Sequence, residues 1–94
     1  MRNYEFTVIF VADEERKNAG LEAVTGALAA AGAEITKQDD MGVKFFAYEI
    51  QKQDKGHYVY FELAVDPAKI VEFEQAFRLN HNIMKFLFVH KADK

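Results

Sequence analysis

Few side chains in this chain commonly take part in catalysis, and their spacing matches no familiar reaction. His57, His81 and His90 fall in three separate segments, without the His-x-x-x-His or Glu-x-x-His spacing of a metal site. Serine and cysteine are both absent, which excludes the two commonest nucleophiles. Gly42 and Gly56 each stand alone, so the chain has no glycine-rich phosphate loop. We therefore expect no enzymatic activity, no metal and no cofactor.

Two clusters of charged residues have simpler explanations than a binding site. Asp39-Asp40 lies close before a glycine, and a solvated turn is a commoner use of that pattern than a cation site. Glu14-Glu15-Arg16-Lys17 is typical of the exposed first turn of a helix. The formal net charge of -3 and the pI near 5.6 argue against broad, nonspecific binding of nucleic acid. Any such contact must be local and made by a few placed basic residues.

Length and composition predict a folded globule. The 94 residues are enough for one modest core, and we expect a single domain over residues 1–94. The hydrophobic fraction of 50% and the nine phenylalanines argue against disorder. The lack of cysteine excludes disulfides and fits a reducing cytosol, and we expect no segment to span a bilayer.

The pattern of apolar residues predicts six elements that position these side chains. The first half should hold a strand over Tyr4–Val11, a helix opening at residues 12–15 with Asp13 as its N-cap and ending at Gly32, and a strand from Ala33 to Lys37. This strand either continues through residues 39–42 with a bend or bulge, or breaks there. Next we expect a hairpin that turns at Asp54-Lys55-Gly56, a helix that starts at Asp66-Pro67, and a strand over Ile83–Val89.

The order β-α-β-β-α-β predicts an α+β fold of the ferredoxin-like kind. Helical crossovers on either side of a hairpin suit a four-stranded antiparallel sheet with both helices on one face. Such a fold hosts many unrelated activities, so it does not identify a function.

Residue parity divides the strands between a helix-covered core and an open face. The residues expected in the core are Tyr4, Phe6, Val8, Phe10, Phe46, Tyr48, Ile50, Val59, Phe61, Leu63, Phe86 and Phe88. Those expected on the open face of the hairpin and last strand are Phe45, Ala47, Glu49, Tyr58, Tyr60, Glu62, Lys85, Leu87 and Val89. So many apolar side chains on an uncovered face indicate an interaction site, the alternative being scattered exposed aromatics on an ordinary sheet.

Several motifs in order resemble the family of protein six of the bacterial small ribosomal subunit. The opening Met1-Arg2-x-Tyr4-Glu5 is similar to the start of that family, and G-V-K-F-F-A-Y-E-I-Q-K at residues 42–52 resembles its signature block. Gly56-x-Tyr58 falls where the family has a Gly-x-Tyr turn. The segment F-R-L-N at residues 77–80, followed by Ile83, Lys85 and Val89, resembles its last helix and strand. The resemblance covers almost the whole chain.

The resemblance implies a non-enzymatic, ferredoxin-like protein of the cytoplasmic ribosome. It implies pairing with the basic small-subunit protein eighteen and binding to the central domain of small-subunit rRNA during assembly, with no membrane and no small-molecule substrate. The matching positions suggest phosphate contacts at Arg2, Lys44, Lys85 and Lys91. The face expected to meet the protein partner comprises Phe45, Ala47, Tyr58, Tyr60 and Leu87.

Other hypotheses remain beside the ribosomal one. Many family members carry a basic pair where this chain has Lys44-Phe45, so one rRNA contact is either lost or replaced by stacking. Tyr58 and Tyr60 could stack on unpaired bases, although the chain lacks the Gly-Phe-aromatic signature of such RNA-binding sheets. A homodimeric regulatory domain that binds a small ligand would also use this fold and an apolar open face. An acylphosphatase-type enzyme would need an anion-binding arginine loop, which residues 11–14 do not resemble.

Overall fold

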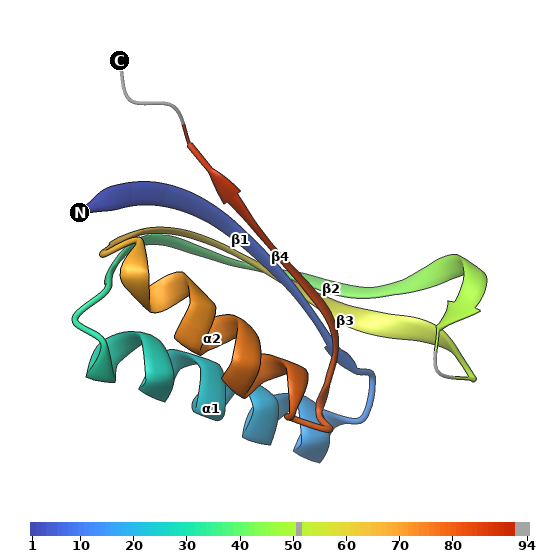
Figure 1. Ribbon diagram of the computed structural model, residues 1–94. Coiled ribbons are helices and arrows are strands. Elements are labelled where there is room, and N and C mark those ends of the chain that lie inside the picture. Colours follow the sequence, from blue (N-terminus) through green and yellow to red (C-terminus); the bar gives the residue numbers. More distant parts are fainter. Residues whose placement is uncertain (51, 92–94) are drawn as a thin grey trace.

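The computed structural model, which describes residues 1–50 and 52–91, contains the six elements in the expected order. The elements are β1 (Arg2–Val11), α1 (Glu14–Ala30), β2 (Glu34–Ile50), β3 (Gln53–Val65), α2 (Ala68–Arg78) and β4 (Ile83–His90). The strands form one antiparallel sheet in the order β2-β3-β1-β4, and both helices cover the same face of it (Figure 1). The predicted ferredoxin-like fold is confirmed. No helix in the described ranges is long and apolar enough to cross a membrane.

The main core lies between the sheet and the two helices. Phe6 is fully buried at its centre, and its ring stacks on that of Phe88 with 4.1 Å between the centroids. Val24 and Leu28 face the sheet from α1, as Phe73 and Phe77 do from α2. The predicted core rows of β1, of β4 and of β3 from Val59 onward are confirmed.

Local signals set the helix ends as the sequence predicts. The Asp13 carboxylate accepts the backbone N–H of Arg16 at 3.1 Å, which satisfies one of the free donors at the start of α1. Gly32 follows that helix with φ of +75°, a left-handed conformation that costs glycine little. At the start of α2 the Asp66 carboxylate accepts the N–H of Ala68 at 3.0 Å.

Strand β2 continues through residues 39–42 with a bulge. Its register against β3 shifts between Asp40 and Gly42, where Gly42 has φ of +79°. The Asp40 carboxylate accepts the Gly42 N–H at 2.9 Å and thereby holds the bulge. Of the alternatives left by the sequence, the structure therefore has a bulged continuous strand.

The predicted hairpin turn at Asp54-Lys55-Gly56 is wrong. Ile50 pairs with Gln53, so the chain reverses between these two residues, and Lys52 adopts φ of +63° there. Gly56 lies within β3 instead, paired with Val11 on one side and Lys44 on the other. It lacks a side chain for a packing reason, because a Cβ there would lie 2.5 Å from Ile9 Cγ2 and 2.7 Å from Phe46 Cζ.

The assignment of Phe46, Tyr48 and Ile50 to the helix-covered core is also wrong. With the earlier turn β3 begins at Gln53, and the end of the β2–β3 hairpin extends past the helices (Figure 1). Tyr48 is 85% exposed. Phe46 and Ile50 pack against the small cluster formed by Ile9 and its neighbours on the other face of the sheet.

Candidate functional site on the open face of the sheet

The sheet face turned away from the helices, here called the open face, is organised in rows that cross all four strands. Three rows follow from the strand pairing, each read from β4 through β1 and β3 to β2: Val89-Glu5-Glu62-Lys37, Leu87-Thr7-Tyr60-Asp39 and Lys85-Ile9-Tyr58-Gly42. Paired residues in a sheet point to the same side, so the members of each row are neighbours. The face therefore has an acidic row at one end and, at the other, a row that combines a lysine with apolar side chains.

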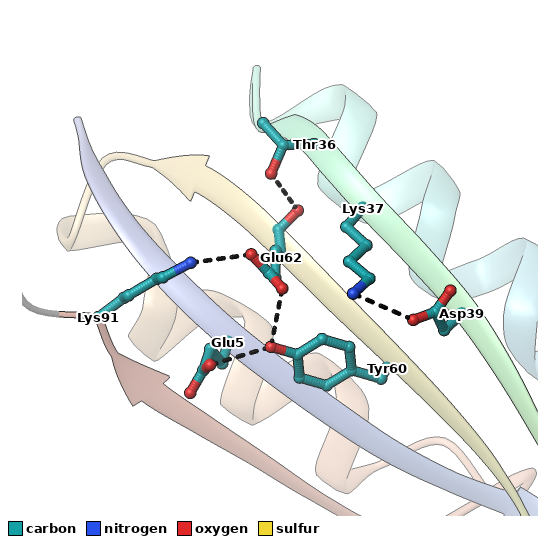
Figure 2. A network of polar contacts seen from close by, with 7 residues as sticks. All are labelled: Glu5, Thr36, Lys37, Asp39, Tyr60, Glu62 and Lys91. Carbon is teal, nitrogen blue, oxygen red and sulfur yellow. Dashed lines mark hydrogen bonds and ion pairs between the residues drawn. The ribbon is translucent and has the colours of Figure 1, made fainter.

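The acidic row contains two carboxylates directly opposite each other, an arrangement that is destabilising unless it is neutralised. The Tyr60 hydroxyl lies 3.0 Å from Glu5 Oε1 and 3.1 Å from Glu62 Oε2 and donates its proton between them (Figure 2). Lys91 Nζ lies 2.9 Å from Glu62 Oε1. In the described part of the chain Glu62 thus has an ion-pair partner and Glu5 has none, although Lys91 also attracts Glu5 at longer range.

The contacts in this network fix its protonation state. Desolvation, together with hydrogen bonds to the two glutamates, raises the pKa of Tyr60 well above its usual range. The hydrogen bond from Lys91 lowers the pKa of Glu62 more than desolvation raises it, and the same bond raises the pKa of Lys91. At neutral pH the tyrosine is therefore a neutral donor beside an anion and a cation. Such a network of charge-assisted hydrogen bonds is suited to recognition of a polar partner.

The opposite end of the open face is apolar and basic. Ile9, Val11 and Met84 are nearly buried there, and Phe46, Ile50 and Tyr58 pack against them. Lys44 Nζ lies 5.8 Å from the centre of the Tyr58 ring, within the range of a cation–π contact. Lys85 approaches the same cluster from β4, where it is opposite Ile9.

The structure brings together three of the five residues predicted to meet a protein partner. Tyr58, Tyr60 and Leu87 all face the open side, and Leu87 is 60% exposed. The open-face assignment of Phe45 is wrong, because this residue pairs with Lys55 and points to the helix side of the projecting hairpin. Ala47 is exposed, in the stretch of the hairpin where the β2–β3 register is irregular.

The four predicted phosphate-binding residues lie in three different settings. Lys44 and Lys85 lie on the open face at its apolar end, on either side of Ile9 and Tyr58. Arg2 is exposed at the first position of β1. Lys91 is engaged with Glu62 at the acidic end. The structure thus groups two of the four.

Two features of the structure were missed from the sequence, the first on the open face and the second on the helix side of the sheet. The contacts among Glu5, Tyr60 and Glu62 follow from parity once the β1–β3 register is known, so their shared face was the available signal. Asp40 is the second: its carboxylate bonds to the His57 ring and lies 3.3 Å from Lys17 Nζ. Partial burial raises the pKa of Asp40, but the hydrogen bonds from Gly42, His57 and Lys17 outweigh it and leave the pKa below its ordinary value. No three metal-ligating side chains gather anywhere in residues 1–50 and 52–91.

Comparison with known proteins places the chain in a family. A family model described as ribosomal protein S6 matches residues 3–90. The small ribosomal subunit protein bS6 of Treponema denticola is 38% identical over 93 residues, which are 99% of this chain and 100% of the relative. That of Solidesulfovibrio magneticus is 36% identical over 97 residues, 100% of this chain and 94% of the relative.

Solved structures agree with the sequence relatives. The crystal structure of 30S ribosomal protein S6 from Thermotoga maritima has a TM-score of 0.87 at 27% identity, covering 96% of this chain and 87% of that one. The C-terminal domain of MgtC from Mycobacterium tuberculosis, with a TM-score of 0.66 at 12% identity, shares the fold alone. With the fold, the motifs and a family match over most of its length in agreement, the chain belongs to the ribosomal protein S6 family.

Proposed function

We propose that this chain is a structural constituent of the small subunit of a cytoplasmic, bacterial-type ribosome. In this proposal residues 1–94 act as one domain, without catalysis, and bind the central domain of small-subunit rRNA together with the basic small-subunit protein eighteen. Membership of the S6 family supports the ribosomal role. We assign one end of the open face to the protein partner and the other end to RNA. This assignment rests on the separation of charge between the two ends.

The acidic end of the open face suits a basic protein. Glu5 and Glu62 lie side by side there, with Asp39 in the next row. These three carboxylates outnumber the two lysines beside them, Lys37 and Lys91. Tyr60 and exposed Leu87 lie in the next row and offer the aromatic and aliphatic surface typical of an interface core. Complementary charge of this kind favours the correct partner and speeds association.

The apolar, basic end of the open face suits RNA. Lys44 and Lys85 have no ion-pair partner within the described ranges, unlike Lys17, Lys37 and Lys91. Unpaired lysines release counterions when they contact phosphates, which makes such binding strongly dependent on salt. A chain with a net charge of -3 cannot supply much of this attraction alone, so the basic partner provides the rest.

The test combines the purified chain, protein eighteen and a central-domain rRNA fragment in a binding titration at several salt concentrations. We expect weak RNA binding by the chain alone and tight, salt-sensitive binding by the pair. A pair that binds RNA no better than either protein alone would refute the proposal. A homodimer stabilised by a small metabolite would instead support a regulatory domain.

Two substitutions separate the two ends of the open face. Tyr60→Ala should weaken pairing with protein eighteen about 10-fold, the usual scale for truncating an interface aromatic. This effect should exceed the loss of folding stability caused by removing the hydrogen bonds of Tyr60 to Glu5 and Glu62. Lys85→Ala should leave pairing intact and lower only RNA affinity. Lys69→Ala is the matched control, because Lys69 lies on α2 and pairs with Glu72, away from the open face. If Tyr60→Ala lost as much free energy of unfolding as free energy of pairing, the assignment of Tyr60 to the partner-binding face would be contradicted.

A further inference from the structure

The two edge strands of the sheet differ in how they are protected from further pairing. Strand β2 carries charges at six of its seventeen positions, and its register against β3 shifts at three points. Charges and bulges are the usual means by which an edge is kept from adding another strand. Strand β4 has eight residues, IMKFLFVH, with Lys85 as its one residue of permanent charge. Its register against β1 is irregular once, between Ile83 and Lys85. From Lys85 to His90 the edge is regular, extended and mostly apolar, and so it is suited to pairing.

The backbone of β4 presents hydrogen-bonding groups along that edge. The Lys91 N–H donates to the carbonyl of Asn3 at 2.8 Å, which shows that this position points toward β1. Because successive residues of an antiparallel strand alternate in direction, Phe86, Phe88 and His90 direct their N–H and C=O groups away from β1. No described strand lies on that side of β4.

Hollows flank β4 on both faces of the sheet. On the helix side, a hollow of about 320 Å³ lies between α2 and β4, lined by Glu74, Phe77, Arg78, Ile83, Met84, Lys85 and Phe86. On the open face, a hollow of about 230 Å³ is lined by Thr7, Ile9, Lys85, Phe86 and Leu87. A strand placed beside β4 would send alternate side chains to the two faces, one set toward each hollow.

These features together favour a peptide over a nucleic acid at the edge. A row of alternating backbone donors and acceptors is matched by another backbone, and pockets for alternate side chains add selectivity. The helix-side hollow is lined by one arginine, Arg78, and one carboxylate, Glu74, while the side chain of Lys85 belongs to the open face. Arg78 has no ion-pair partner in the described part of the chain. Its charge is complementary to one carboxylate on the incoming segment.

We propose that the edge of β4 is a docking site for an extended segment of a protein partner, which adds to the sheet as a fifth strand and places a carboxylate near Arg78. The site lies along the sheet edge and includes the margin of the open face beside β4, at Lys85 and Leu87. It shares Lys85 with the proposed RNA contact, whereas Lys44 and Tyr60 take no part in it.

The test uses ¹⁵N-labelled full chain and a capped synthetic peptide of alternating valine and threonine with one central glutamate. Amide exchange at Phe86, Phe88 and His90 should slow about 10-fold or more at saturating peptide, because these groups become paired. A peptide with lysine in place of the glutamate should bind at least about 5-fold more weakly. Arg78→Ala should abolish that difference between peptides, whereas Lys69→Ala should preserve it.

Several results would overturn the proposal. They are an absence of amide protection with peptide up to about 1 mM, protection confined to β2, and equal binding of the two peptides to the unaltered chain. Protection of the same amides by a single-stranded RNA oligonucleotide would assign the edge to nucleic acid. Protection that rises with protein concentration alone, with a dimer in sedimentation velocity, would assign it to a second copy. Amide exchange in β4 and binding of the synthetic peptides are measured without protein eighteen. A failure of the chain to pair with protein eighteen would therefore leave these two measurements unchanged, and each proposal can be refuted without the other.

Discussion

Replacing Gly56 with alanine tests whether this glycine serves packing rather than a turn. A Cβ at this position would lie 2.5 Å from Ile9 Cγ2, 2.7 Å from Phe46 Cζ and 3.3 Å from the carbonyl oxygen of Phe10. Carbon atoms in good contact are about 3.5–4.0 Å apart, so the first two contacts are too short by roughly 1 Å. The Phe46 ring can swing away at its outer end, but Ile9 is nearly buried and β-branched and therefore rigid.

Overpacking of this kind costs about 1–3 kcal/mol in the free energy of unfolding. We expect Gly56→Ala to lose that amount in urea denaturation, with an unchanged slope. The melting temperature should fall by roughly 4–8 °C for each kcal/mol in a domain of this size. The destabilisation should arise in the apolar cluster on the open face, because Gly56 pairs with Val11, which lies in that cluster with Ile9.

Two further variants make this prediction refutable. Gly26→Ala is the matched control, since nothing lies within 4 Å of its added Cβ in α1, and it should stabilise the chain by about 0.5–1 kcal/mol. Combining Gly56→Ala with Ile9→Ala should cost less than the sum of the two changes, because Ile9 Cγ2 is then gone. A Gly56→Ala variant as stable as the unaltered chain, or strict additivity with Ile9→Ala, would refute the reasoning.

Two other predictions concern stability. Leu28→Ala should lower the free energy of unfolding by about 2–5 kcal/mol in urea denaturation, because Leu28 is fully buried. Leu87 is 60% exposed, so Leu87→Ala should change it by no more than about 0.5 kcal/mol. Similar losses in the two variants would contradict the core assignment. Asp40→Asn should destabilise the chain at pH 6. The folded-state pKa of Asp40 lies below its ordinary 3.8, so this contribution is present above that value and is lost as pH falls through the folded pKa. The difference in free energy of unfolding between the unaltered chain and Asp40→Asn should therefore be present at pH 6 and shrink at lower pH. A difference that stays constant with pH would exclude the ionised carboxylate as its source.

Local sequence signals were sufficient for the order of elements and for most of the core. Alternation in β1 places Phe6 and Val8 on the buried side and Thr7 on the other, whatever the neighbouring strands do. Asp13 and Gly32 mark the ends of α1 because their preference for caps is a property of a few adjacent atoms.

The hairpin shows where such local signals fail. Asp54-Lys55-Gly56 has turn composition, but Gly56 is small because Ile9 packs over it from a strand distant in sequence. The bulge at Gly42 also shifts the register of β2, and one residue of shift exchanges the two faces. These two effects together moved Phe46 from the expected core to the open face and Phe45 away from it.

The candidate site divides in the same way. The sequence by itself determined the family, the fold and the open-face placement of Tyr58, Tyr60 and Leu87, because motif order and strand parity are written in the chain. Only the tertiary structure set Glu5 opposite Glu62 and Lys44 over Tyr58. It also left β4 at an edge with a hollow on each side. Register and strand order depend on packing between distant segments, and no local pattern encodes that packing.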